Sequence, residues 1–197
     1  CALPIYSAYD RVHLSEVFGG RAPKELQMAD PEWYAEKDVS LILSCKAESL
    51  DLAKKQVISE HGEIYAFDKM VLATGSYPFV PPIPGHTRAG CYVYRTPADL
   101  EAIRDACAGG RTGVVVGGGL LGLEAANGLM IRGMSVTVVH ISGVLMERQL
   151  DQVAGQLLQR ALEERGLKFR MGGQTQELVG NADGRVKAVR FKDGSEV

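Results

Sequence analysis

The segment that decides the fold reads Gly113-Val114-Val115-Val116-Gly117-Gly118-Gly119-Leu120-Leu121-Gly122. An apolar run leads into glycines spaced as G-x-G-x-x-G, and a helix-forming sequence follows, which is the context that predicts a dinucleotide-binding loop. In such a loop Gly117 permits the tight turn, Gly119 leaves room for a pyrophosphate, and Gly122 lets the helix pack close to the strand. The candidate NAD(P)H-binding loop is therefore Gly117, Gly118, Gly119, Leu120, Leu121 and Gly122, with a ligand-free glycine turn as the alternative.

The sequence on both sides of this loop predicts a doubly wound parallel sheet. Apolar runs of strand length alternate with helix-length segments, and the order βαβαβ favours parallel strands. The expected strands are residues 113–116, 135–141 and 167–171, and the expected helices are 120–131 and 150–165. The second helix carries one apolar stripe, which we expect to face the sheet: Leu150, Val153, Ala154, Leu157, Leu158, Ala161 and Leu162. A hairpin is expected to follow, with arms at 176–179 and 186–192.

Upstream of residue 112 the pattern is different. Short, partly alternating runs predict an antiparallel meander, with strands at 39–43, 47–50, 56–59 and 64–67. Residues 70–73 form a continuous apolar run that predicts a strand buried on both faces, and a proline-rich connector follows. Helices are expected at 31–37, with Asp30 as N-cap, and at 96–107, with Thr96 as N-cap.

Composition excludes several classes of function. The 197 residues carry a net charge of -2, which argues against a nucleic-acid or anionic-membrane surface. The longest apolar run is about half of the ~20 residues that a membrane span needs. The four cysteines form no C-x-x-C pair and no metal-ligand spacing, so we expect no metal site. Reduced thiols in a cytoplasmic protein are the simplest interpretation.

Both ends of the chain are interpreted as cut. Residues 1–7 are taken as a non-native tail, because the first five form a short apolar tag without periodicity. Residues 191–197 stop one step into the return arm of a hairpin, where a chain seldom ends. We therefore expect an internal fragment of a longer protein.

Three further residues are candidates for contact with the cofactors. The residue that ends the second strand of such a fold often binds the adenosine ribose through an acid, yet here it is His140. This histidine is interpreted as stacking on adenine, as pairing with a 2′-phosphate, or as a solvated strand end, and Arg148 is a second candidate for the adenosine end. The choice between NADH and NADPH stays open. Glu124 lies on the first turns of the helix, where it either complements the helix dipole or lies near the nicotinamide or flavin ring.

Several motifs together resemble the two-dinucleotide-fold flavoprotein disulfide reductase superfamily. These motifs are Ala73-Thr74-Gly75-Ser76-x-Pro78, Pro82-x-Pro84-Gly85, Tyr94-Arg95-Thr96 and Val116 to Ala126. Within the superfamily, Tyr9-Asp10-Arg11-Val12-x-Leu14-Ser15 and Leu145-Met146-Glu147-Arg148-Gln149-Leu150-Asp151 look most like the large subunits of NAD(P)H-dependent assimilatory nitrite reductases. The resemblance covers nearly the whole chain after about residue 7.

The resemblance implies a two-domain FAD-dependent NAD(P)H oxidoreductase, used in nitrate assimilation. Residues 8–110 would be a partial FAD-binding domain and 111–197 a truncated NAD(P)H-binding domain. The residues it places near FAD are Arg11, Ser15, Ala47, Thr74, Gly75 and Arg95. Iron–sulfur and siroheme centres would lie outside this chain, and a homodimer is left open. The electron acceptor is not identified.

Departures from the superfamily keep two alternatives open. Related ferredoxin reductases carry a lysine just after the Leu-Ser pair, able to pair with the helix glutamate, and here that place holds Glu16. A redox-active cysteine pair is also missing. The alternatives are a ferredoxin- or rubredoxin-type reductase and a non-catalytic NAD(H)-binding module. Because the first FAD glycine loop lies outside the chain, we expect weak flavin retention and little activity from the fragment itself.

Overall fold

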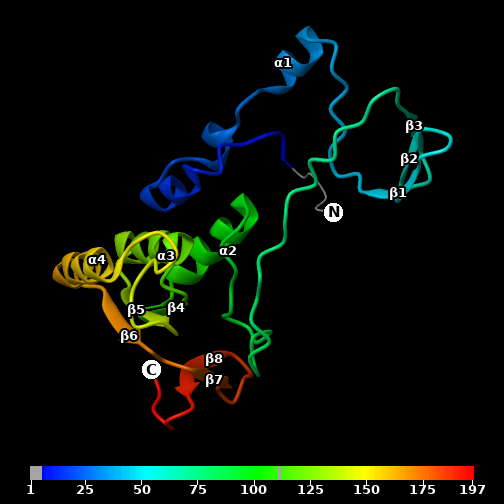
Figure 1. Cartoon of the computed structure of the whole chain (residues 1–197). Helices are drawn as coiled ribbons and strands as arrows, with labels where there is room; N and C mark the ends of the chain where they lie inside the picture. Colours follow the sequence, from blue (N-terminus) through cyan, green and yellow to red (C-terminus); the bar gives the residue numbers. More distant parts are fainter. Residues whose placement is uncertain (1–5, 111) are drawn as a thin grey trace. The chain divides into compact units, whose positions relative to one another are not determined.

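The computed structural model describes residues 6–110 and 112–197. The described residues form two compact units, 6–13 with Ala22–Pro78, and Leu14–Arg21 with the described part of Phe79–Val197 (Figure 1). Residues 1–5 of the expected non-native tail lie outside the described part, whereas Ser7 is buried and the Tyr6 ring meets the Tyr9 ring edge-on at 6.3 Å. The domain boundary expected at residue 110 stays a prediction, because the division into units follows packing contacts and falls after Pro78.

The first unit contains an antiparallel sheet. Strand β1 (Ala47–Asp51) pairs with β2 (Gln56–Ser59), which pairs with β3 (Ile64–Ala66). This arrangement confirms the expected meander over these three strands. Two short helices precede it, the 3-10 helix η2 (Pro23–Leu26) and α1 (Pro31–Glu36). Helix α1 begins as expected, because the Asp30 carboxylate accepts the Trp33 N–H at 2.8 Å and Pro31 follows the cap.

Two expected strands of this unit are wrong. Residues 39–43 and 70–73 form no strand, and none of the described strands pairs with them. The side chains of Val71 and Leu72 are 88% and 68% exposed, where the apolar run predicted burial on both faces. An apolar sequence only favours a strand, since the strand itself needs neighbours that satisfy its backbone groups.

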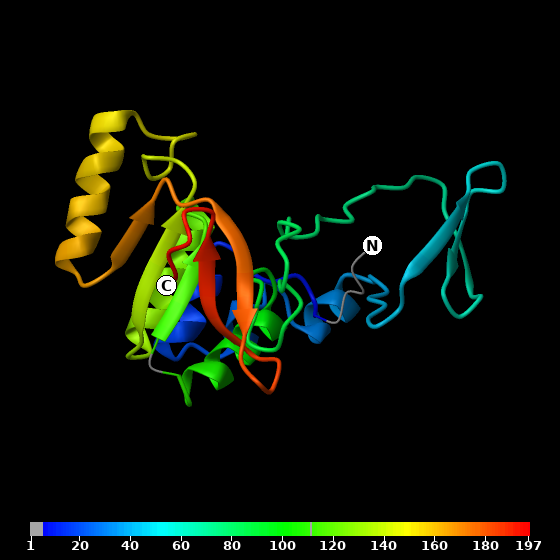
Figure 2. The same cartoon turned by 90° about the horizontal axis from the view of Figure 1, so that it is seen from below.

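The second unit is built on the predicted parallel sheet (Figure 2). Its strands are β4 (Thr112–Val116), β5 (Ser135–His140) and β6 (Lys168–Met171), in that spatial order. Helices α3 (Leu120–Ile131) and α4 (Gln152–Glu164) make the two crossovers. Val115 lies opposite Val138 and Val116 opposite Val139, so β4 and β5 end together beside the glycine loop. The mixed α/β fold with a parallel sheet is confirmed.

Each face of the sheet has its own apolar cluster. Val136, Val138 and Leu167 pack with Ala126 of α3 on one face. Val139 packs on the other face against Val189 and Phe191 of the hairpin formed by β7 (Thr175–Gly180) and β8 (Val186–Phe191). Alternation along β5 therefore directs His140 to the same face as Val136 and Val138.

Helix α4 only partly matches its predicted stripe. Leu162 packs against the first cluster, but Val153 and Leu157 are exposed. The helix is shorter than predicted at both ends. It begins at Gln152 because Asp151 is its N-cap, accepting the Ala154 N–H at 2.8 Å.

The remaining elements of this unit are α2 and η1, and η1 packs against both α3 and α2. Helix α2 (Pro97–Cys107) has the predicted cap, with Thr96 Oγ1 accepting the Asp99 N–H and the Asp99 carboxylate accepting the Thr96 N–H. The 3-10 helix η1 (Leu14–Gly19) buries Phe18 against α3 at Gly128, where a Cβ would overlap the Phe18 ring. This packing explains why residues 14–21 belong to the second unit.

Candidate dinucleotide-binding site

The three spaced glycines have the geometry that their spacing predicts. Gly117 has φ +126, a conformation that favours glycine, and its N–H donates to Val139 O at 2.8 Å. At Gly122 a Cβ would overlap the carbonyl oxygen of Gly117, so only glycine allows the helix to approach the strand this closely. Gly119 is the N-cap of α3, and a Cβ built on it meets nothing within 4 Å.

The start of α3 is suited to an anion. The first N–H groups of a helix have no acceptor within the helix, and the aligned peptide dipoles place partial positive charge there. No acidic residue lies in the first turn of α3 to compete for this position. The open space at Gly119 therefore lies beside unsatisfied backbone donors, which is the arrangement that holds a pyrophosphate.

Gly118 has a different function from its neighbours. It is buried, and its N–H donates to Nδ1 of His140 at 3.1 Å. A Cβ at Gly118 would come within 2.7 Å of Leu145 and 2.8 Å of the His140 ring. The middle of the loop is thus packed inward, while Gly119 faces the open side.

His140 is 7% exposed, so it is not a solvated strand end. Because Nδ1 accepts a backbone N–H, the ring proton belongs on Nε2, which lies 2.9 Å from the Glu147 carboxylate. Both ring nitrogens are therefore engaged by the protein. The prediction that His140 contacts NAD(P)H stays a prediction, and what the structure shows is a histidine that supports the glycine loop.

Glu147 is the residue that the sequence analysis missed as a candidate. Its hydrogen bond from His140 holds the pKa of the carboxyl below its usual range, and 43% of its side chain is exposed. The loop that carries it is tied to the glycine turn by the Met146 N–H, which donates to Gly118 O at 3.1 Å. The signal was an acid seven residues beyond the strand end, and only the fold of this loop shows where it lies.

Glu124 lies on α3, is half-buried and is next to Tyr94, whose ring forms an aromatic pair with Phe18. The Tyr94 hydroxyl is 3.5 Å from the Glu124 carboxylate, and its ring stacks on Phe18 with centroids 6.1 Å apart. Tyrosine therefore partners this glutamate where related ferredoxin reductases are expected to use lysine. Glu16, at the expected lysine position, instead pairs with Arg21 at 2.6 Å.

Known proteins resemble nearly the whole of this chain. The model of the pyridine nucleotide-disulphide oxidoreductase family matches residues 7–197. The chain belongs to this family. It is 43% identical to the nitrite reductase [NAD(P)H] large subunit of Klebsiella oxytoca and 42% identical to the nitrite reductase [NAD(P)H] of Bacillus subtilis, over 98% and 96% of the chain. It spans only 20% and 23% of the length of those relatives.

A solved structure shows the same fold as this member of the pyridine nucleotide-disulphide oxidoreductases. A ferredoxin reductase from Rhodopseudomonas palustris superimposes with a TM-score of 0.91 at 23% identity, over 98% of this chain and 48% of that one. That structure therefore shares the fold of this chain.

The residues expected to hold FAD in this family member lie in different elements. Arg11, exposed Ala47 of β1 and exposed Thr74 and Gly75 belong to the first unit, whereas Ser15 of η1 and Arg95 before α2 belong to the second. Each assignment stays a prediction. Arg148 is exposed one residue after Glu147 and likewise stays a prediction for the adenosine end.

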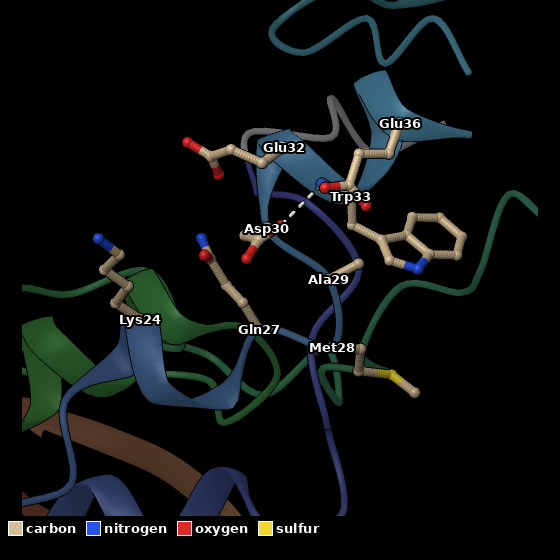
Figure 3. Close-up of a pocket in the computed structure, with 8 residues that line it drawn as sticks. All are labelled: Lys24, Gln27, Met28, Ala29, Asp30, Glu32, Trp33 and Glu36. Carbon is tan, nitrogen blue, oxygen red and sulfur yellow. Dashed lines mark hydrogen bonds between the residues drawn. The ribbon is translucent and has the colours of Figure 1, made fainter. Parts of the chain in front are cut away.

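The described residues also line a pocket that lies apart from the glycine loop in the sequence. A shallow pocket of about 480 Å³ lies in the first unit, and none of the residues predicted to bind FAD or NAD(P)H line it (Figure 3). Its lining mixes both charges with Trp33 and Met28, and Asp30 there is already the cap of α1. In the described residues no three His, Cys, Asp or Glu side chains gather as metal ligands. None of the helices in that part of the chain is long and apolar enough to cross a membrane.

Proposed function

We propose that this chain is part of the NAD(P)H-oxidising portion of a nitrite reductase large subunit, in which a hydride passes from NAD(P)H to FAD. The observation that carries the proposal is the open face at Gly119, which caps α3 in the turn that follows β4 and lies beside the first N–H groups of that helix. The proposal is further supported by the identity with nitrite reductases, which extends over almost the whole chain.

The chain would bind NAD(P)H through backbone rather than side chains. Gly119 leaves space for the pyrophosphate. The backbone N–H groups at the start of α3 would donate hydrogen bonds to its oxygens and stabilise their negative charge. Gly117 and Gly122 fix the turn, while His140 holds Gly118 in place. Exposed Leu120 and Leu121 flank the opening and would exclude water from one side of the bound cofactor.

FAD supplies a hydride acceptor that can release electrons singly, so the protein needs only to position it and tune its charge. Arg11, Ser15, Ala47, Thr74, Gly75 and Arg95 would hold it. The residues at 74–75 fit a close approach of a ligand to the main chain, because both are exposed and Gly75 has φ +69. Glu124, oriented by Tyr94, would lie nearest to the reacting rings. Hydride transfer requires no acid or base, and we assign none.

The electron acceptor would lie outside residues 1–197. By the resemblance to nitrite reductases it would be an iron–sulfur and siroheme centre, and the process served would be nitrate assimilation. The alternative acceptor is a separate ferredoxin, and the experiment below distinguishes the two acceptors.

The experiment uses the full-length protein. Wild type should bind NADH or NADPH in calorimetric titration, contain FAD, and couple oxidation of the nucleotide to reduction of nitrite. Gly119→Glu should abolish nucleotide binding, because a carboxylate would fill the open side of the turn and repel the pyrophosphate. Gly109→Glu is the matched control, since a Cβ there also meets nothing within 4 Å, and Gly109 follows α2 and precedes β4, whereas Gly119 follows β4. Nucleotide binding by Gly119→Glu at wild-type affinity would overturn the site, and oxidation coupled only to an added ferredoxin would overturn the nitrite reductase assignment.

A further inference from the structure

The strand-end position that normally reads the adenosine ribose is not free to do so. A dinucleotide domain commonly places an acid at the end of its second strand, where it accepts the ribose hydroxyls. Here that residue is His140, which is buried and uses Nδ1 for the Gly118 N–H and Nε2 for Glu147. Neither nitrogen remains for a ligand.

A negatively charged side chain nevertheless lies next to His140, at the same end of β5. The Glu147 carboxylate lies 2.9 Å from the His140 ring, and only Oε2 takes part in that contact. A carboxylate accepts about four hydrogen bonds, so acceptor capacity remains on a side chain that is 43% exposed. The hydrogen bond from His140 keeps the pKa of the group below its usual range, and Glu147 is therefore charged at neutral pH.

The position of Glu147 is fixed by packing. The side chain of Leu145 is fully buried and fills the space that a Cβ at Gly118 would need. The next residue, Met146, donates its N–H to Gly118 O. Two consecutive residues thus hold the loop against the glycine turn, and the third carries the acid. A carboxylate fixed relative to a pyrophosphate loop is what selection of a ribose requires.

We propose that Glu147, presented by His140, is the residue that binds the adenosine ribose hydroxyls and selects NADH over NADPH. The proposal rests on the proposed function, since it requires that the glycine loop binds a nicotinamide dinucleotide. The carboxylate accepts a hydrogen bond that the 2′-hydroxyl of NADH donates, and the same charge repels the 2′-phosphate of NADPH. Selection therefore has an attractive and a repulsive part.

Arg148 favours the opposite outcome. Its guanidinium is exposed and follows Glu147 directly, and a cation at this end of the site would attract a 2′-phosphate. Glu147 is favoured because its carboxylate is anchored to the strand end by a side-chain hydrogen bond.

The test measures dissociation constants of the full-length protein for NADH, NADPH and 2′-deoxy-NADH by calorimetry. Wild type should bind NADH at least ten times more tightly than either of the other two. In Glu147→Gln the ratio of the NADPH dissociation constant to the NADH dissociation constant should fall at least tenfold. The ratio of the 2′-deoxy-NADH constant to the NADH constant should also fall. Glu164→Gln, which removes an equal charge from the exposed end of α4, should leave all three ratios unchanged.

The outcomes separate the two proposals. Absence of binding of any nucleotide to the folded wild type would contradict the proposed function. Binding with an unchanged ratio in Glu147→Gln, including an equal loss of affinity for all three ligands, would overturn the assignment of Glu147 and leave the site intact. A ratio that changes in Arg148→Gln but not in Glu147→Gln would also overturn it and assign selection to Arg148.

Discussion

The ring of His140 accepts the backbone N–H of Gly118 at 3.1 Å, so a side chain at the end of β5 holds the middle of the glycine turn that follows β4. The turn is thus supported from within the protein, while its open side at Gly119 is left for a ligand. Since a ring nitrogen that accepts an N–H must be unprotonated, this contact also fixes the tautomer of the histidine and directs its own N–H to Glu147.

The first prediction concerns the two central glycines of the loop. Gly118→Ala should destabilise the protein by about 1–3 kcal/mol, the usual cost of forcing an extra methyl group into a packed site. The methyl would press on Leu145 and on the His140 ring. Gly119→Ala is the matched control, because its methyl enters open space. Urea unfolding checks the pair, and equal stability of the two variants would contradict the inward packing of Gly118.

The second prediction tests the hydrogen bond itself. His140→Ala leaves the buried Gly118 N–H without an acceptor, which costs about 1–3 kcal/mol of stability. Hydrogen exchange of the Gly118 amide should become faster by at least tenfold. Glu147→Gln is the control, since it leaves the Gly118 contact in place and should keep that amide slow. A Gly118 amide that exchanges at the same rate in wild type and His140→Ala would show that the bond does not protect the turn.

Features that depend on short-range interactions could be predicted from the sequence. The βαβαβ order, the cap at Thr96 and the roles of Gly117 and Gly122 depend on neighbours within a few residues or on a repeated pattern, and all are found in the structure. Strands at 39–43 and 70–73 depend on pairing partners that no local pattern specifies, and these predictions were wrong.

The candidate site divides in the same way. The spacing of the glycines identified the loop, but the role of His140 depends on which way its ring turns, which is decided by the Gly118 N–H across the sheet. Glu147 was missed because its position depends on the path of residues 141–151, where Leu145 is buried against the turn. The residues expected around FAD are predicted by the resemblance alone, and no local pattern in the sequence specifies them.

The third prediction concerns Cys107, at the end of α2. Burial raises the pKa of its thiol above the ordinary value of 9.0, although Arg132 acts in the opposite direction. Alkylation by iodoacetamide requires the thiolate, so the rate at this residue should reach half its maximum above pH 9 and be slow at pH 8. Because the folded pKa is raised, the stability linked to this thiol is present below pH 9 and is lost as the pH rises through the folded value. Peptide mapping after timed alkylation measures the rate, and Cys107→Ser should remove the slow site.

The fourth prediction tests how η1 is held on α3. Gly128→Ala places a methyl group where the Phe18 ring lies, and the resulting overpacking should cost about 1–3 kcal/mol. Displacing Phe18 also disturbs its stacking on Tyr94, the partner of Glu124, so the variant should weaken the contact that orients this carboxylate.

A second substitution tests whether the Phe18 ring is the cause. Phe18→Leu in the Gly128→Ala background should restore part of the lost stability, because a smaller side chain leaves room for the methyl. Gly133→Ala, at the end of the same helix, is not a suitable control because Gly133 has φ +81, whereas Asn127→Ala alters the exposed neighbour without touching Phe18. Urea unfolding of the four proteins decides the point, and a Gly128→Ala variant as stable as Asn127→Ala would exclude close packing of Phe18 on α3.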